Sequence, residues 1–251
     1  KQLITLWNTY SFFVTYANLD GFNPDTDSVS EDDYTTLDRW IVAKTQNLIK
    51  EANSCYNEYR VFQLMKLIKK FIDDLSNWYV RRSRRRFWRS ENNIDKKAAY
   101  TTLYTVLVDL IKVLSPITPF ISEHIYQNLV FGFNSDENPE SIHLCEFPTC
   151  NDDLVDHELI NNIDGIITIV SLGRSARSRA NIKNRQPLHK LFVYIPNDKN
   201  IILDKISKEE ILDELNMKEF NLVSSPNDIV NYTIKPNFVS LKDKFGDKMK
   251  D

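Results

Sequence analysis

The feature that most constrains the fold is a stretch of thirteen residues, 77–89, which combines six arginines with four large aromatic side chains. It continues an amphipathic helix whose apolar residues recur at three- and four-residue spacing, namely Leu64, Ile68, Phe71, Leu75 and Tyr79. The same register places Arg82, Arg86 and Arg89 on the apolar face. A core cannot hold three unpaired guanidinium groups. The pattern predicts one helix over 61–88 that leaves its bundle near its end or meets an anion.

Basic charge is segregated in this part of the chain. Residues 60–97 hold 12 basic and 4 acidic side chains, a local net charge of +8, whereas the whole chain carries −3. Arginine suits phosphate groups, and neighbouring aromatic rings can stack on unpaired bases. The combination indicates recognition of single-stranded or looped RNA. The alternative is a solvated charged face whose aromatic residues belong to the core.

A second basic cluster follows an acidic segment. Residues 131–165 contain nine acidic side chains and no Lys or Arg, and residues 174–190 contain six basic and no acidic side chains. The spacing of Ile160, Ile163, Ile167 and Val170 predicts a helix over 153–180 that turns basic near its end, with Asp152 or Asp153 as its cap. Two basic patches on separate elements suit a bound polyanion.

The remaining pattern predicts a mainly helical protein. Apolar residues at helical spacing indicate helices over 3–19, 37–59, 61–88, 95–114 and 119–129, which would form an antiparallel bundle. We expect Asp95 to cap the fourth helix, Thr118 to cap the fifth, whose first residue is Pro119, and Tyr59 to lie on the apolar stripe of the second. Residues 141–144 are extended in character.

The last part of the chain changes character. Short apolar runs at 191–195, 220–223 and 232–234, with a helix over 207–215, predict a small α/β subdomain, followed by a charged tail. The expected division is a helical-bundle domain over 1–152, a long helix and basic connector over 153–188, and the α/β subdomain over 189–251.

No catalytic or metal site is predicted. The three cysteines and four histidines are scattered, without zinc-ligand spacing or a disulfide framework, which predicts reduced thiols in a cytoplasmic protein. The Lys-Ile-Ser-Lys run at 205–208 resembles a phosphate-binding loop, but Ser207 with Glu210 fits a capping box, and no glycine-rich phosphate loop occurs. No apolar run is long enough to cross a membrane, and Lys1 within a predicted helix suggests a piece of a larger chain.

Several segments resemble the C-terminal region of isoleucyl-tRNA synthetases, a family of class Ia aminoacyl-tRNA synthetases. They are Leu-Trp-Asn-Thr-Tyr-Ser-Phe-Phe at 6–13, Leu-Asp-Arg-Trp at 37–40, the arginine-rich block at 77–88, Leu-Ser-Pro-Ile-Thr-Pro-Phe at 114–120, Leu-Gly-Arg at 172–174, Arg-Gln-Pro-Leu at 185–188 and Ile-Lys-Pro-Asn-Phe at 234–238. The Leu-x-Pro-x-x-Pro-Phe element is shared with the valyl and leucyl members. The arginine-rich block, with the Arg-Gln-Pro-Leu and Lys-Pro-Asn segments, points to the isoleucyl member.

The resemblance implies an anticodon-binding bundle followed by a junction subdomain, joined in cis to an upstream catalytic domain that uses ATP and Mg²⁺. This part alone would be non-catalytic, hold no cofactor, bind the anticodon stem-loop of isoleucine tRNA and be a monomer. The candidate tRNA-binding residues are Trp78, Tyr79, Arg81, Arg82, Arg84, Arg85, Arg86, Trp88, Arg89, Arg174, Arg177, Arg179, Lys183 and Arg185. Of these, Arg82 and Arg86 could instead be structural, paired with Asp73, Asp74 or the acidic segment 131–165.

Three alternatives remain open at this point. The first is the same domain from a valyl- or leucyl-tRNA synthetase. The second is a non-catalytic helical scaffold whose basic elements dock an acidic protein. The third is an enzyme with a cryptic site, which is the weakest because no grouping of carboxylates, histidines or thiols suits acid/base or nucleophilic work.

Overall fold

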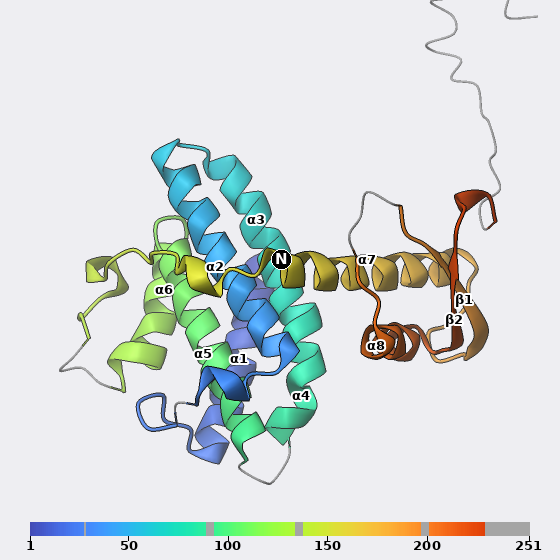
Figure 1. The fold of residues 1–251 in the computed structure, drawn as a ribbon. Coiled ribbons are helices and arrows are strands. Elements are labelled where there is room, and N and C mark those ends of the chain that lie inside the picture. The colour runs from blue at the N-terminus through green and yellow to red at the C-terminus, as the bar shows by residue number, and fades with distance from the viewer. Residues whose placement is uncertain (28, 89–92, 134–137, 197–200, 229–251) are drawn as a thin grey trace, which may run out of the picture. The chain divides into compact units, whose positions relative to one another are not determined.

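The computed structural model describes residues 1–27, 29–88, 93–133, 138–196 and 201–228 (Figure 1). The chain forms two compact units, one ending at Asp164 and the other beginning at Gly165. The first contains α1 (Gln2–Asp20), α2 (Thr36–Asn57), α3 (Val61–Asp74), α4 (Arg81–Trp88), α5 (Ile94–Leu114) and α6 (Pro119–Tyr126). The second contains β1 (Leu188–Tyr194), α8 (Lys205–Leu215) and β2 (Met217–Val223), and α7 (His157–Arg179) runs across the boundary. This confirms the predicted mainly helical fold class.

The first unit is a helical bundle in which α5 packs against α1, α2, α4 and α6 (Figure 1). The buried face of α5 includes Tyr100, Leu103 and Leu107, as its sequence register predicts. Gly21 ends α1 in the left-handed conformation, with φ of 67°, where glycine carries no steric penalty. The apolar faces of these helices therefore pack around one common core.

The predicted helix over 61–88 is a continuous helical run with a wide turn inside it. A π-helical turn, Leu75–Val80, joins α3 to α4. The apolar face is buried as predicted, because Leu64, Ile68, Phe71, Leu75 and Tyr79 are all nearly inaccessible to solvent. Beyond the wide turn the inward positions pass to Ser83 and Phe87. Of the five arginines of α4, Arg84 and Arg85 are exposed and the other three are half-buried.

Several local predictions are wrong. Asn93, and not Asp95, caps α5, because its side-chain oxygen accepts the Lys96 N–H at 2.9 Å. Thr118 does precede Pro119 at the start of α6, although its side chain accepts no helix N–H. Tyr59 lies at the end of the α2–α3 hairpin with positive φ and is exposed, because α2 ends two residues earlier.

The other local corrections concern short segments. Residues 142–144 form a 3₁₀ turn and are not extended. Asp156, and not Asp152 or Asp153, accepts the Leu159 N–H in the first turn of α7. Asp204 caps α8, so Ser207 is the N–H donor to the cap and does not begin a capping box. The strand predicted at 232–234 lies outside the described residues.

In the second unit, β1 and β2 form a parallel pair joined by α8, with Leu188 opposite Met217 and Tyr194 opposite Val223. Gly173 of α7 lies so close to α8 that a Cβ atom there would approach Leu215 Cδ1 to 2.5 Å. Glycine at this position therefore allows α7 and α8 to pack closely. Across the described ranges, no helix is both long and apolar enough to cross a lipid bilayer.

Candidate RNA interface

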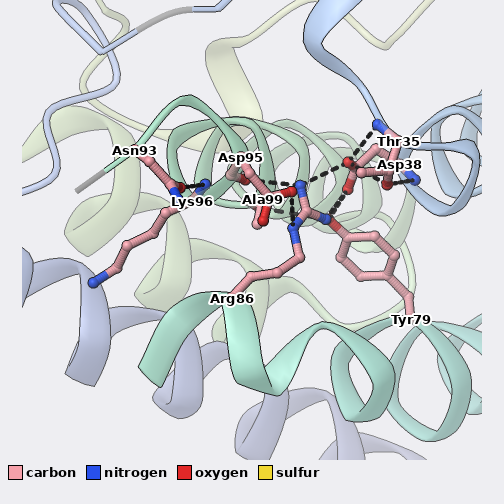
Figure 2. A network of polar contacts seen from close by, with 8 residues as sticks. All are labelled: Thr35, Asp38, Tyr79, Arg86, Asn93, Asp95, Lys96 and Ala99. Carbon is pink, nitrogen blue, oxygen red and sulfur yellow. Dashed lines mark hydrogen bonds and ion pairs between the residues drawn. The ribbon is translucent and has the colours of Figure 1, made fainter. Parts of the chain in front are cut away.

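Arg86 is the centre of a buried polar network at the inner side of the arginine-rich helix (Figure 2). Its Nη1 and Nη2 atoms donate to Oδ1 and Oδ2 of Asp38 at 2.7 and 2.8 Å. Nη2 also donates to the main-chain oxygen of Asp95 at 2.8 Å, and Nε forms an ion pair with the Asp95 carboxylate at 2.8 Å. The anion that the apolar face requires is thus supplied from within the fold, at the starts of α2 and α5.

Asp38 is fully buried and accepts hydrogen bonds from two further residues. The Tyr79 hydroxyl donates to Oδ1 at 2.7 Å, and the backbone N–H and hydroxyl of Thr35 donate to Oδ2 at 3.0 and 2.7 Å. Burial, reinforced by the charge of Asp38, holds the pKa of Tyr79 well above its usual range. Burial lowers the pKa of Arg86, but the hydrogen bonds to Asp38 and the nearby charges outweigh it and raise that pKa. Tyr79 and Arg86 are therefore held as a neutral phenol and a cation.

The first aromatic residue of the block is also turned inward. Trp78 is only 4% exposed, and the guanidinium groups of Arg81 and Arg82 lie over its ring at 5.9 and 5.0 Å from the centroid. Arg81 Nε also donates to the Asn77 main-chain oxygen at 2.9 Å. The predicted role of Trp78 and Tyr79 as stacking platforms is wrong, because both rings are inside the bundle.

The exposed part of the block is smaller than predicted. Arg84 and Arg85 are exposed, and neither makes an ion pair or hydrogen bond with any residue in the described part of the chain. Trp88, one turn after Arg84, is 57% exposed. This arrangement places two solvated cations beside an accessible indole at the end of α4. Arg89, also a candidate, lies outside the described residues.

The second basic cluster divides in the same way. Arg177 is 4% exposed and donates to three main-chain oxygens, from Nε to Leu215 at 3.1 Å and from Nη2 to Gln186 at 2.5 Å and Asn216 at 3.5 Å. Arg174 forms an ion pair with Glu214. By contrast, Arg179, Lys183 and Arg185 are exposed and make no ion pair with the residues that the structure describes. Arg177 is therefore part of the core of the second unit.

The described residues include no group of three or more His, Cys, Asp or Glu side chains placed to hold a metal ion. One hollow of the first unit has a volume of about 430 Å³. Its lining includes Glu31, Asp32, Asp153 and Asp156, together with Arg39, Gln46 and apolar side chains. The lining contains none of the candidate arginines, and its acidic side chains would repel a phosphate backbone.

Residues 38–192 match the family described as the anticodon-binding domain of tRNA ligase, a span that includes α4 and both basic clusters. The chain belongs to this family. It is 45% identical over 98% of its length to the isoleucine-tRNA ligases of Clostridium kluyveri and Clostridium tetani, and 45% identical over 86% to that of Dehalococcoides mccartyi. The chain spans about a quarter of the length of these relatives.

The anticodon-binding domain contains structural residues that sequence reasoning missed. Asp38 and Asp95 are the partners of Arg86, whereas the sequence suggested Asp73, Asp74 or the segment 131–165. The Thr35-x-x-Asp38 spacing is a form of capping box and could have marked Asp38 as a helix-cap residue. No sequence signal shows that the same carboxylate also binds a guanidinium 48 residues later.

Proposed function

We propose that this chain is the tRNA-binding, anticodon-recognising part of an isoleucine-tRNA ligase, an enzyme that would attach isoleucine to its tRNA with ATP and Mg²⁺. The observation that carries the proposal is the exposure of Arg84, Arg85 and Trp88 in the C-terminal part of α4, inside the span that matches the anticodon-binding family. The identity to proteins named isoleucine-tRNA ligase supports the isoleucine assignment.

The exposed groups have different chemistry and therefore different proposed roles in binding RNA. Arg84 and Arg85 offer two solvated cations for phosphate oxygens, and the Trp88 ring offers a face on which an unpaired base can stack. Arg179, Lys183 and Arg185 add a second set of cations in the other unit. Because base stacking requires an unpaired base, this combination favours a loop over a continuous duplex.

In the parent protein we propose that a catalytic domain in cis would carry the chemistry, that the partner would be the anticodon stem-loop of isoleucine tRNA, and that the protein would work as a cytoplasmic monomer. The candidate alternatives are the corresponding domain of a valyl- or leucyl-tRNA ligase and a scaffold that binds an acidic protein.

The experiment is to measure the affinity of this chain for an isoleucine tRNA transcript and for the same transcript carrying a valine anticodon, at two salt concentrations. We expect tighter binding to the isoleucine anticodon, and we expect the preference to persist at the higher salt. Because phosphate contacts are salt-sensitive and sequence-independent, equal and steeply salt-dependent binding to both transcripts would contradict anticodon recognition. Preference for the valine anticodon would favour the valyl alternative.

A further inference from the structure

The loop between α7 and β1 carries two of the exposed cations, Lys183 and Arg185. The side chains of Arg177 and Asn216 donate hydrogen bonds to its backbone. Three successive carbonyl groups of this loop accept hydrogen bonds. Asn216 Nδ2 donates to the oxygens of Asn184 and Arg185 at 3.1 and 3.0 Å, and Arg177 Nη2 donates to the oxygen of Gln186 at 2.5 Å. The loop backbone is thus attached at consecutive residues.

Both holding residues are themselves fixed. Arg177 is buried, and its Nε donates to the last carbonyl of α8, that of Leu215, at 3.1 Å. Asn216 follows α8 in the left-handed conformation, with φ of 49°, and its own carbonyl accepts the Leu188 N–H at 3.1 Å. The C-terminal end of α8 carries partial negative charge, which favours a cation such as Arg177. The loop therefore rests on the rigid junction of α8 with the sheet.

While its carbonyls are bound, the loop directs its cationic side chains to solvent. Lys183 and Arg185 are exposed, as is Arg179 at the end of α7. The exposed residues from 179 to 187 include no Trp, Tyr or Phe. Such a surface can bind phosphate oxygens but has no ring on which a base could stack.

We propose that Arg177 and Asn216 are positioning residues that preform this loop for the phosphate backbone of the tRNA. The inference rests on the proposed function and adds to it a phosphate-specific contact surface in the second unit. A preformed loop binds more tightly because the ordering of its backbone does not have to occur on binding. The loop contributes affinity without distinguishing anticodons, whereas the end of α4, with Trp88, contributes the distinction.

The test uses Asn216→Gly in the full 251-residue chain. Glycine retains the left-handed backbone without strain and removes only the side-chain amide. The matched control is Asn181→Gly, because Asn181 also has positive φ, lies at the start of the loop away from its bound carbonyls, and makes no side-chain hydrogen bond with the described residues. A third variant, Lys183→Ala with Arg185→Ala, removes the proposed phosphate-binding cations directly.

We expect Asn216→Gly to weaken binding of the isoleucine and valine-anticodon transcripts by the same factor, roughly threefold to tenfold, the range for ordering one or two groups. Asn181→Gly should leave both affinities unchanged. The double variant should reduce the slope of log affinity against log salt by about 0.7 to 0.9 for each phosphate-bound cation that it removes. Added to the double variant, Asn216→Gly should have no further effect, because its role operates through the two removed cations.

Other outcomes overturn the proposal. An equal loss from Asn216→Gly in the parent and in the double variant would mean that Asn216 acts on the fold as a whole. Unchanged binding after Asn216→Gly would show that Asn216 does not preform the loop for binding. Unchanged binding after removal of both cations would show that the loop does not contact RNA. In each of these cases the parent chain still binds tRNA and the proposed function stands. A parent chain that binds no tRNA would contradict both.

Discussion

The guanidinium group of Arg86 binds both carboxylate oxygens of Asp38 in a two-point fork, at 2.7 and 2.8 Å. The pair joins α4 to the first turn of α2, and Asp38 also completes the cap of α2 with Thr35. A residue in the middle of an RNA-binding sequence pattern is therefore part of the architecture of the bundle. Charge-assisted forks of this kind are strong and directional.

Replacing Asp38 by Asn should leave the Arg86 cation buried with one carboxylate fewer. We expect the free energy of unfolding to fall by roughly 3 to 5 kcal/mol, as when one partner of a buried ion pair is removed. Urea denaturation followed by circular dichroism measures this. Arg39→Ala, at the exposed neighbouring position, is the control and should stay within about 0.5 kcal/mol of the parent. Equal stabilities of the Asp38 variant and the control would show that the fork contributes nothing.

Asp109 of α5 predicts a pH dependence of stability. Burial raises the pKa of its carboxyl group to about 6, against a smaller opposing effect of Lys112. The folded protein therefore keeps this proton to higher pH than the unfolded chain, so this group lowers the free energy of unfolding as pH rises from about 4 to about 6. Asp109→Asn should remove the penalty and stabilise the protein at pH 7 by at most about 3 kcal/mol.

Denaturant unfolding of Asp109→Asn and the parent at several pH values between about 4.5 and 7.5 checks this. The stability advantage of the variant should widen up to about pH 6.5 and then stay constant. A constant difference between the Asp109 variant and the parent across the range would mean that the carboxyl group titrates normally.

Two arginines that look alike in sequence should respond oppositely to substitution. Arg85→Ala should retain stability, weaken tRNA binding and flatten its salt dependence by about 0.7 to 0.9 in the log-log slope, as removal of one phosphate-binding cation requires. Arg177→Ala should instead reduce stability by roughly 1 to 3 kcal/mol, because the buried Leu215 carbonyl and two part-buried carbonyls lose their donor. Thermal melts and salt-dependent binding of both variants separate the two effects. Loss of stability in the Arg85 variant would contradict its solvated position.

The two tryptophans of the block make a similar pair. Trp88→Ala should weaken tRNA binding by about 1 to 3 kcal/mol, the usual loss for one stacked base, and should leave the melting temperature near that of the parent. Trp78→Ala should destabilise the bundle by about 3 to 5 kcal/mol, because a large buried ring is removed. Binding and melting measurements on each variant distinguish a loss of tRNA binding from a loss of stability. Unchanged binding of the Trp88 variant to both anticodon transcripts would exclude base stacking at this position.

The sequence predicted elements and buried faces well where apolar periodicity is long. The stripe containing Leu64, Ile68 and Phe71 is buried because many weak preferences agree over several turns. Helix caps were predicted less well, since Asn93 and Asp95 are both acceptable caps two residues apart and the local turn decides between them. The 3₁₀ turn at 142–144 is too short to leave a periodic signal.

The candidate interface was predicted only as a set of charges. Sequence reveals that a residue is a cation but not whether the fold supplies its counter-charge, and that depends on contacts between distant positions. Arg86 and Arg177 have such internal partners, whereas Arg84 and Arg85 do not among the described residues. The individual roles in tRNA binding therefore stay predictions, now confined to the exposed members.

The wide turn Leu75–Val80 determines which side chains of the following helix α4 face the core. If the same residues there took ordinary α-helical winding, with none removed, the following segment would rotate by about 100°. Arg86 would then lose its hydrogen bonds to Asp38, and a different set of arginines would face solvent, although the sequence of the arginine-rich block would be unchanged. Related proteins that match this block residue for residue therefore present the same surface only where they also share the wide turn.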